Sequence, residues 1–589
     1  MCNLAHGLRV VCLTSLLFAA PALAGLVPIQ VDGFYDDWQG ETALIDDSGD
    51  DAGPVDFGRV WVANDQDYLY IRFETGGEVQ SDEQQTMRLY LDTDMNAGTG
   101  TSYGGIGADL MWEFGWREGD FRGANIRHDD IGLLMGSTVS DTQFEIGLRR
   151  DATPNGALFP GATVRFLLRD MDSADVTTVV EYTFAAGSDV PPVLGLGRSN
   201  PTDIRVASWN VQGDGLFDGG TAEAAQNRLL DAMDPDVLII TEAWNSTASD
   251  VVGIIEQHLP SGAGETWYGV KEDAGNVIVS RFPILQSWEV NPGYRITAVL
   301  LELGPDYDTD LLVFGCHWRC CTADDDRQNE ADSVIEFMHD ARNPGGLITL
   351  PANTPMVLGG DLNLVGWRQQ LTTLVTGDIQ DESTYGPDSA PDWDGADFTY
   401  ANSRHPEGRG TYTWRNDGSS YYPGVLDFIF YTDSALDLQT HFVLETRTMS
   451  SGTLSANGLQ EFDTTNASDH AARVADFSMG PDVSPVPDAG HGLRAARLLP
   501  NVPNPFNPTT ELRFALEDAG QVGLRVFDAR GRLVRRFAPE GYTAGTHGVT
   551  WDGRDQTGRS MSSGVYYVQM VSTVNGETGR EMRSVVLVE

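Results

Sequence analysis

The sequence predicts a multidomain protein in which two β-rich regions flank a central region of alternating helices and strands. The chain has 589 residues, which at roughly 150 residues per domain corresponds to three or four domains. Residues 25–195 and 498–589 carry short runs of alternating apolar and polar residues between polar turns, which is typical of β-strands. Between them, helical stretches precede apolar runs, as in "TAEAAQNRLLDAM" before "DVLIITEA", and this alternation favours an α/β fold.

Residues 1–24 are predicted to be a secretory signal peptide. Arg9 precedes an apolar run that ends in the small-residue pattern Ala22-Leu23-Ala24. No cysteine follows the expected cleavage point, so we expect no lipid anchor. The rest of the chain has no run of about 18 apolar residues, so we expect no transmembrane helix in the mature protein. The expected location is therefore outside the cell or on its outer surface.

The charge of the chain limits its partners. The formal net charge is −48, and the only lysine is Lys271. Such a surface repels polyanions at long range, which weighs against a large basic face for tight nucleic-acid binding. The acidity is equally consistent with a solubility adaptation, so it does not select a substrate class by itself.

The N-terminal region, residues 25–195, resembles family 9-like carbohydrate-binding and DOMON-like domains of secreted bacterial proteins. The matching pieces are "IQVDGFYDDW", "NDQDYLYIRFE" and "LDTDMNAGTG". The resemblance implies a β-sandwich with a glycan as partner, and Trp112 and Trp116 are the candidates for stacking on sugar rings, with core packing as the alternative. Asp92, Asp94 and Asn96 stand at alternate positions, a spacing that a structural Ca²⁺ ion accepts, although a simple turn explains it equally.

The C-terminal region, residues 498–589, follows a linker at 480–497 that is rich in Pro, Gly and Asp. Its pieces "LLPNVPNPFNPTT", "VFDARGRLVRR" and "GVYYVQM" resemble the FlgD Ig-like sorting modules of surface-exported bacterial proteins. The resemblance implies an immunoglobulin-like β-sandwich and a partner in the secretion machinery, for which a type IX system is the expectation. It implies no chemistry.

Polar side chains follow apolar strands in the central region, residues 200–479. Glu242 ends "DVLIITE", and "MVLGGDLNL" delivers Asp361 and Asn363. Acids at the carboxyl ends of strands lie where α/β active sites form. Because side chains alternate along an extended strand, Asp361 and Asn363 are expected on the same side. A carboxylate beside an amide suits a phosphate with its metal ion, although each pair taken alone is equally typical of turns.

The order of the central motifs is similar to that of the endonuclease/exonuclease/phosphatase superfamily. The chain presents "VASWNVQGD", "DVLIITEAW", "GNVIVSRFPI", "VFGCHW", "VLGGDLNL", "GVLDFIFYT" and "ASDHAARV" in sequence. The resemblance implies a four-layered α/β sandwich and the hydrolysis of phosphoester bonds. It also implies a divalent cation, usually Mg²⁺, with Mn²⁺ or Ca²⁺ as alternatives.

The resemblance assigns roles to individual residues. The expected metal-binding residues are Asn210, Glu242 and Asp469. The expected catalytic residues are His317, Asp361, Asn363, Asp427 and His470. Arg295, Arg319 and Arg327 are candidates for binding the substrate phosphate, since a guanidinium suits that geometry, and surface ion pairs are the alternative.

The substrate is less well specified than the reaction. An extracellular nuclease-like phosphodiesterase is the first hypothesis, and a sphingomyelinase or inositol-phosphate phosphatase is the second. The aromatic stretch "SSYYPG", residues 419–424, is expected either as a hydrophobic patch or as part of the pocket rim. A non-catalytic glycan-binding surface adhesin is the alternative from a different class.

All cysteines that remain after signal cleavage lie in "FGCHWRCC". In an extended strand Cys316 and Cys320 face the side opposite to His317 and Cys321, so these groups cannot converge on one tetrahedral zinc ion. We expect a disulfide bond instead, either between Cys320 and Cys321 or from Cys316 after a turn.

Overall fold

The computed structural model describes residues 29–588 with short gaps. The undescribed internal segments are 50–52, 54, 82–85, 188–189, 218, 263–264, 305–306, 308, 480–495, 504–505, 517–518, 529–532, 557–558, 562 and 575–576. The predicted signal peptide and most of the linker therefore lie outside the described residues. The chain forms two compact units, one of residues up to Pro191 together with Asp417–Tyr422, and one of Pro192–Asn416 and Pro423–Glu589.

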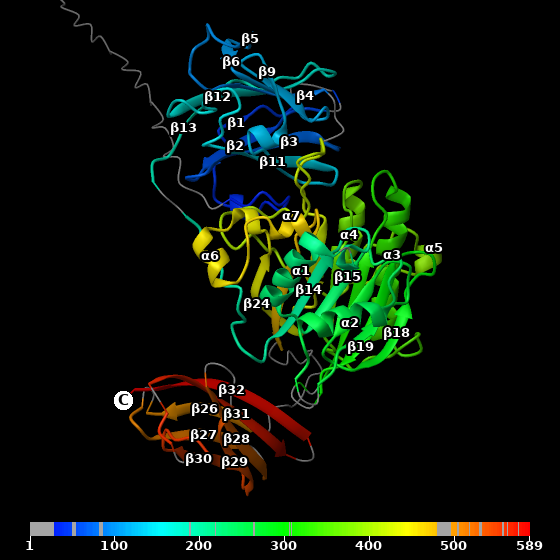
Figure 1. Cartoon of the computed structure of the whole chain (residues 1–589), viewed down its shortest axis with the longest axis vertical. Coiled ribbons are helices and arrows are strands. Elements are labelled where there is room, and N and C mark those ends of the chain that lie inside the picture. Colours follow the sequence, from blue (N-terminus) through cyan, green and yellow to red (C-terminus); the bar gives the residue numbers. More distant parts are fainter. Residues whose placement is uncertain are drawn as a thin grey trace, which may run out of the picture. The chain divides into compact units, whose positions relative to one another are not determined.

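The N-terminal region is a sandwich of two antiparallel sheets, as the sequence predicts (Figure 1). One sheet has the order β1-β2-β3-β11-β10, with β1 (Ile45–Asp46), β2 (Arg59–Asn64), β3 (Tyr68–Val79), β10 (Leu134–Gly136) and β11 (Asp141–Arg149). The other has the order β13-β12-β4-β7-β8-β9, with β4 (Met87–Asp92), β7 (Leu110–Glu113), β8 (Glu118–Phe121), β9 (Ala124–Ile126), β12 (Thr163–Asp170) and β13 (Val180–Thr183). Alternate side chains such as Phe73, Leu89 and Leu91 fill the space between the sheets.

The central region is built on two six-stranded mixed sheets. The first has the order β16-β17-β15-β14-β25-β24, with β14 (Ile204–Asn210), β15 (Val237–Thr241), β16 (Tyr268–Val270), β17 (Val277–Ser280), β24 (Leu436–Val443) and β25 (Arg473–Met479). The second has the order β18-β19-β20-β21-β23-β22, with β18 (Ile284–Glu289), β19 (Ile296–Glu302), β20 (Asp310–His317), β21 (Met356–Asp361), β22 (Thr399–Tyr400) and β23 (Asp427–Tyr431).

Helices cover the outer faces of these sheets, which gives the predicted four layers. The helices are α1 (Gly220–Met233), α2 (Ala248–His258), α3 (Asp324–Arg342), α4 (Arg368–Thr376), α5 (Glu382–Tyr385), α6 (Ser451–Ala456) and α7 (Asp463–Ala467). Period-two alternation makes this possible: Val206 and Ile239 pack between the sheets, whereas Leu238 faces α1 and α2. On the other side Phe337 of α3 packs edge-on against Phe314 of β20.

Two glycines allow close packing at the end of β21, one against the facing sheet and one against the neighbouring strand β20. A Cβ atom on Gly359 would come within 2.7 Å of Ile239, on the facing sheet. A Cβ atom on Gly360, which has φ +149°, would lie 1.8 Å from the carbonyl oxygen of Cys316. The "GGD" stretch is therefore the end of a buried strand, and its glycines set the position of Asp361.

The C-terminal region is a second β-sandwich, which confirms the predicted fold class. A three-stranded sheet contains β26 (Ala496–Val502), β27 (Thr510–Leu516) and β30 (Gly545–Trp551). A four-stranded sheet contains β28 (Gly520–Asp528), β29 (Leu533–Tyr542), β31 (Gly564–Val574) and β32 (Glu577–Leu587). Within the described residues, no helix combines the length and the apolar character that crossing a membrane requires.

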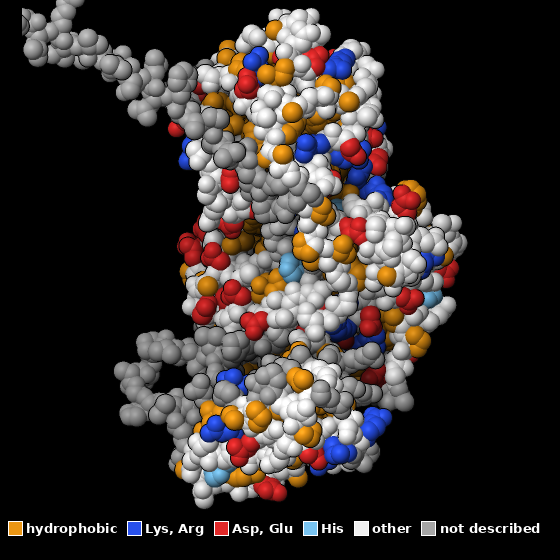
Figure 2. Space-filling model, turned by 90° about the vertical axis from the view of Figure 1, so that its left-hand side faces the viewer, with side chains coloured by type: hydrophobic (Ala, Val, Ile, Leu, Met, Phe, Trp, Pro, Cys, Tyr) orange, Lys and Arg blue, Asp and Glu red, His pale blue; other side chains and the backbone are white. Residues whose placement is uncertain are grey.

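Acidic side chains are spread over the face of the molecule that Figure 2 shows. The only lysine adds little to the surface charge, because Lys271 Nζ donates to the carbonyl oxygens of Ala243, Trp244 and Ser246 at 2.5, 3.1 and 2.8 Å. Lys271 therefore stabilises the segment between β15 and α2.

Candidate active site

Strand ends bring the predicted polar residues together at one edge of the central sandwich. In the second sheet, His317 at the end of β20 pairs with Asp361 at the end of parallel β21. Asp361 in turn pairs with Asp427, the first residue of antiparallel β23. Asn210 ends β14 in the facing sheet, and Glu242 directly follows β15. The strand ends thus place carboxylates from both sheets and the imidazole of His317 at one site.

Glu242 is held by its backbone conformation and by two hydrogen bonds. Its φ of +64° is unusual for a residue with a side chain and turns the chain sharply after β15. Asn210 Nδ2 donates to Glu242 Oε1 at 3.1 Å, and the backbone N–H of Gly213 donates to Oε2 at 2.7 Å. The carboxylate is about a quarter exposed, so it can still bind a ligand from solvent.

Asp361 is the buried centre of the site. Asn210 Nδ2 donates to its Oδ2 at 2.9 Å, and the backbone N–H of Asn363 donates to its Oδ1 at 3.1 Å. Burial raises the pKa of Asp361 to about 7, although the nearby His470 and these hydrogen bonds act in the opposite direction. Near neutral pH this carboxylate can therefore accept or release a proton.

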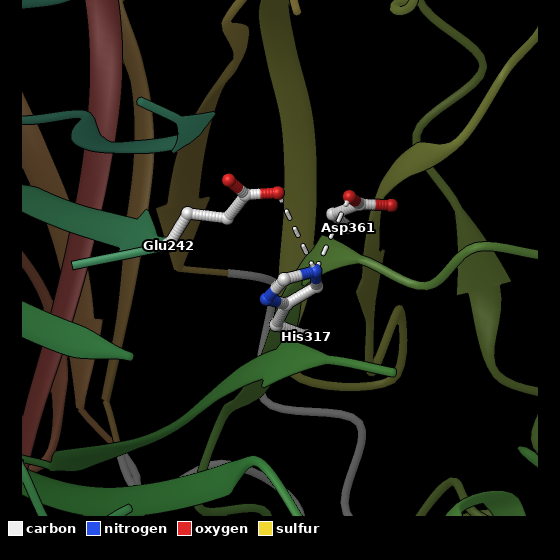
Figure 3. A group of neighbouring side chains, drawn as sticks. All are labelled: Glu242, His317 and Asp361. Atoms are coloured by element: carbon white, nitrogen blue, oxygen red, sulfur yellow. Dashed lines mark ion pairs between the residues drawn. The ribbon is translucent and has the colours of Figure 1, made fainter. Parts of the chain in front are cut away.

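His317 lies between the two carboxylates without a close hydrogen bond to either. Its Nε2 is 3.9 Å from Glu242 Oε1 and 3.7 Å from Asp361 Oδ2. Dashed lines mark both pairs in Figure 3. Its ring packs against Trp244 with a centroid distance of 5.3 Å. Burial lowers the pKa of His317 well below its usual value, and Arg295 and other positive neighbours add to this effect. His317 is therefore neutral at physiological pH.

His470 forms the closest acid–imidazole pair of the site. Its Nδ1 is 2.7 Å from Asp427 Oδ2, and its Nε2 is 3.8 Å from Asp361 Oδ2. Burial lowers the pKa of His470, but the charges of Asp427 and Asp361 outweigh it and raise the pKa to about 10. His470 is therefore positively charged, with Asp427 fixing its ring.

The side chains of Asp469 and Asn363 bond to other groups and do not join the acidic centre directly. Asp469 Oδ2 accepts a hydrogen bond from Trp414 Nε1 at 3.2 Å, and Asp469 is in neither of the two central groups whose ligand atoms all lie within 4.8 Å of one another. Asn363 has φ +46° and donates through Nδ2 to the carbonyl oxygen of Trp318 at 3.2 Å. The prediction that Asp361 and Asn363 share one side required an extended backbone. The backbone at Asn363 is left-handed instead, so that alignment does not apply.

The three arginines considered for phosphate binding have different surroundings. Arg295 donates to the carbonyl oxygens of His317 and Trp318 at 2.6 and 2.8 Å. Arg319 is exposed, and its Nη2 donates to a carbonyl oxygen at 3.2 Å. Arg327 is fully buried and donates to Gln370 Oε1 of α4 and to the carbonyl oxygen of Arg319, so it links α3 to its surroundings and has no access to a substrate. The sequence could not show this burial, because α3 carries polar residues on both faces.

The donor set at this edge fits a hard divalent cation. Ligand atoms of Glu242, His317 and Asp361 lie within 4.8 Å of one another. In the described part of the chain, the ion pairs of Glu242 and Asp361 are with His317 and His470, and none is with Lys or Arg. The negative charge is thus left for a cation, and carboxylates are the ligands that Mg²⁺ prefers. Asn210 as a ligand would require a turn of its amide, because its Nδ2 now faces both carboxylates.

A second acidic group lies in the N-terminal sandwich and differs from the predicted one. Asp92, Asp94 and Asp109 converge within 4.8 Å, whereas Asn96 contributes its backbone N–H to Asp92 and Asp94. Arg122 pairs with Asp109 and Asp94 at 3.0 and 3.4 Å and already supplies a positive charge. Asp92 Oδ2 is buried and has no hydrogen-bond partner among the described residues.

The remaining predictions concern tryptophans and cysteines. Trp112 is buried, which leaves Trp116, 55% exposed, as the tryptophan that can reach a ligand. Cys316, Cys320 and Cys321 are all free, so the structure contains neither of the expected disulfide bonds. Cys320 and Cys321 are exposed, and their sulfur atoms lie 2.8 Å apart.

Two contributors to the site were not foreseen. Trp244 covers the His317 ring, and Trp414 binds Asp469. Trp244 stands two residues after Glu242, a position that could have suggested a role. Trp414 lies in a loop without any motif, so only the fold reveals it.

Comparison with known proteins assigns two parts of the chain to families. Residues 207–470 match the Endonuclease/Exonuclease/phosphatase family, and residues 504–576 match the FlgD Ig-like domain. No curated protein matches the chain significantly.

Several solved structures resemble the chain, each over 47% of its length. TDP2 of D. rerio, solved with a single-strand DNA product, is 15% identical with a TM-score of 0.30 over 99% of its own chain. ANGEL2, described as a 2′,3′-cyclic phosphatase, is 16% identical with a TM-score of 0.31 over 95% of its chain. SmcL is 16% identical with a TM-score of 0.28 over its full chain.

Proposed function

Because residues 207–470 form a domain of the Endonuclease/Exonuclease/phosphatase family, we propose that the protein is an extracellular, divalent-cation-dependent phosphodiesterase. The observation that carries this proposal is the convergence of Glu242, Asp361, His317 and His470 at one sheet edge without a lysine or arginine partner for the carboxylates in the described chain. Such a site holds a cation and a phosphate together and leaves both accessible from the edge of the sheet.

We assign the metal site to Glu242 and Asp361, with Asn210 supporting both carboxylates. Mg²⁺ is the proposed ion, because two oxygen donors leave room for the waters that Mg²⁺ retains. The bound cation supplies charge stabilisation for the phosphate oxygens. Mn²⁺ and Ca²⁺ are the alternatives, and Ca²⁺ would need a larger set of oxygen ligands. Asp469, bonded to Trp414, supports a second metal position less well.

The protein groups divide the proton transfers between them. Asp361 accepts the proton of the water whose oxygen attacks phosphorus, through a carboxylate oxygen that the cation leaves unbound. As the bond from phosphorus to the leaving oxygen breaks, His470 donates its Nε2 proton to that oxygen, while Asp427 keeps the ring oriented. Neutral His317 hydrogen-bonds a non-bridging phosphate oxygen, and Asn363 supports the same phosphate. Arg295 and Arg319 contribute positive charge near the phosphate.

The proposed substrate is a small or flexible phosphodiester. The net charge of −48 and the internal hydrogen bonds of Lys271 oppose a broad basic face for duplex nucleic acid. Single-stranded nucleic acid is the first choice, and phospholipid headgroups and inositol phosphates are the alternatives to be compared with it. The predicted signal peptide and the FlgD Ig-like domain support export, with the secretion machinery as partner.

The experiment measures hydrolysis of bis-p-nitrophenyl phosphate by residues 25–589 with and without Mg²⁺. We expect turnover that EDTA abolishes, that Mg²⁺ restores, and that falls by at least about a thousandfold in Asp361→Ala. Asp340→Ala, an exposed aspartate at the end of α3, is the matched control. Undiminished turnover in Asp361→Ala would contradict the assigned site. An inactive wild type that binds glycans would favour the adhesin alternative.

For the N-terminal sandwich we propose a glycan partner that stacks on Trp116. If Trp116 is the contact, binding of the full chain to a glycan array should be lost in Trp116→Ala and retained in Trp61→Ala. A Ca²⁺ ion in this domain would bind through Asp92 Oδ2 and displace Arg122. A Ca²⁺-dependent rise in the unfolding temperature, absent in Asp92→Asn, would support it.

A further inference from the structure

Residues 417–422 lie inside the sequence of the phosphoesterase domain but fold as part of the N-terminal sandwich (Figure 1). Tyr422 is 9% exposed and belongs to the hydrophobic core of that sandwich. Its ring packs beside Trp112 and His128, with centroid distances of 6.2 Å in both cases. One residue of the stretch 419–424, which the sequence predicts to be a hydrophobic patch or part of a pocket rim, is therefore a core residue of the sandwich.

The hydroxyl of Tyr422 also forms hydrogen bonds within the sandwich. Its hydroxyl donates to the carbonyl oxygen of Phe114 at 2.7 Å and accepts from Trp112 Nε1 at 3.0 Å. Trp112 is buried, so its indole N–H would lose the hydrogen bond to this hydroxyl if the tyrosine withdrew. A buried donor without a partner costs about 1–3 kcal/mol. The sandwich thus holds this tyrosine in one place.

Two arginines of the sandwich bind the rest of the segment. Arg127 donates to the carbonyl oxygens of Asp417 and Ser419, the latter at 2.6 Å. Arg117 stacks over the ring of Tyr421 at 4.0 Å from its centroid. The contacts involve backbone as well as side chains, so the conformation of the whole segment is set by the sandwich.

The residues that flank this segment on both sides lie beside the active-site residues Asp469 and His470. Trp414 and Gly424 pair through two backbone hydrogen bonds of 3.0 and 3.1 Å and close the base of a hairpin, residues 413–427. Trp414 also donates through Nε1 to Asp469 at 3.2 Å and forms a β-bridge with His470. The base of the hairpin is therefore bonded directly to the segment just before β25 that carries His470.

The hairpin also positions the partner of that histidine. Thr413 Oγ1 accepts hydrogen bonds from the backbone N–H groups of Leu426 and Asp427, at 3.0 and 2.9 Å. The backbone N–H of Arg415 donates to the carbonyl oxygen of Asp469 at 3.1 Å. Both members of the Asp427–His470 pair thus depend on one hairpin.

We infer that the N-terminal sandwich acts as a positioning element for catalysis: it holds residues 417–422 and, through the hairpin, fixes the orientation of Asp427 and His470. Tyr422 and Trp414 are the positioning residues at the two ends of this connection. The inference rests on the proposed phosphodiesterase activity. It gives the sandwich a role in turnover that is independent of any glycan.

The direct test lengthens the connection without removing a contact. Two glycines are inserted after Asn416 and two after Tyr422, and the control has two glycines inserted between Gly345 and Gly346 in an exposed loop. We expect kcat for bis-p-nitrophenyl phosphate to fall about tenfold, because misplacement of catalytic groups lowers the rate of the chemical step. KM should stay within about twofold, since binding of this small substrate does not require the hairpin. A kcat equal to that of the control insertion would overturn the inference.

A second variant decides the question if the insertion variant does not fold. Arg127→Gln removes the hold on two carbonyl oxygens at a side chain that is 45% exposed, and Arg165→Gln removes another exposed arginine of the same sandwich. We expect kcat to fall about threefold in Arg127→Gln only, with KM unchanged. Equal kcat values in the two variants would overturn the inference. An inactive wild type would instead overturn the proposed function, and this inference with it.

Discussion

His317 and His470 face the same oxygen atom, Asp361 Oδ2, at 3.7 and 3.8 Å, yet their pKa values move in opposite directions. Burial favours the neutral form of both rings. His470 has the carboxylate of Asp427 at 2.7 Å, whereas the Nδ1 atom of His317 has no hydrogen-bond partner among the described residues. A single bonded carboxylate therefore decides which histidine carries the charge.

This difference separates two tasks within one small site. A charged His470 can release a proton, and a neutral His317 can hydrogen-bond the phosphate without competing with a metal ion for Glu242. The arginines near His317 reinforce the division, because Arg295 and Arg319 disfavour a further positive charge there. The following variants test the two histidines and then the carboxylate between them.

The largest expected effect follows from Asp427→Asn, which removes the charge that distinguishes His470. The amide has nearly the same shape, but it no longer stabilises the imidazolium, so we expect kcat to fall about a thousandfold. Nitrogen-15 NMR of the ring should show His470 neutral at pH 8 in the variant and charged in the wild type. Asp433→Asn, an exposed aspartate just after β23, is the control. A His470 ring that stays charged in Asp427→Asn would contradict this explanation.

A smaller effect is expected from His317→Gln, because glutamine keeps a hydrogen-bond donor but not the imidazole. We expect kcat to fall about a hundredfold. The ratio of wild-type to variant kcat should be constant from pH 6 to pH 9, since His317 is neutral throughout. His339→Gln, on the exposed side of α3, is the control. A ratio that changes more than about threefold over this range would show that His317 titrates during turnover.

The smallest effect concerns stability and the carboxylate that both histidines face. The folded-state pKa of Asp361 is raised from 3.8 to about 7, so its stabilising protonated form is fully present below pH 3.8 and is lost as the pH rises through 7. At pH 8 without metal, Asp361→Asn should therefore raise the free energy of unfolding by about 2 kcal/mol, or the melting temperature of the central domain by roughly 3–6 °C.

Calorimetry at pH 8 and pH 5 measures this effect, and the gain should shrink at the lower pH. Mg²⁺ should raise the melting temperature of the wild type and leave Asp361→Asn nearly unchanged. Asp340→Asn is the matched control. An equal response of both proteins to Mg²⁺ would place the cation elsewhere.

Much of the site could be predicted because strand order determines it. Asn210, Glu242, His317 and Asp361 all stand at or just after the carboxyl ends of apolar strands, and such ends meet at one sheet edge. The local sequence pattern is sufficient to predict these positions, because the alternation of side chains and the direction of the strand determine where its last side chain lies.

Contacts between distant segments could not be predicted in this way. Arg327 looks like a surface residue in the sequence of α3, but helix α4 and the preceding loop bury it. Asp109 joins Asp92 and Asp94 only because β7 pairs with β4. Tyr422 reads as a rim residue of the central domain, and only the tertiary structure shows it in another core. Each outcome depends on packing that no local pattern encodes.

The position of Tyr422 also sets the order in which the chain can fold. Trp112 and Tyr422 are separated by 310 residues, and synthesis at roughly 5–20 residues per second spans that interval in roughly 15–60 s. During this time the N-terminal sandwich lacks one of its core side chains, and the indole N–H of Trp112 lacks its partner. The sandwich therefore reaches its final core only when most of the phosphoesterase sequence has emerged. A chain interrupted before residue 422 leaves an incomplete core that a protease or chaperone can recognise.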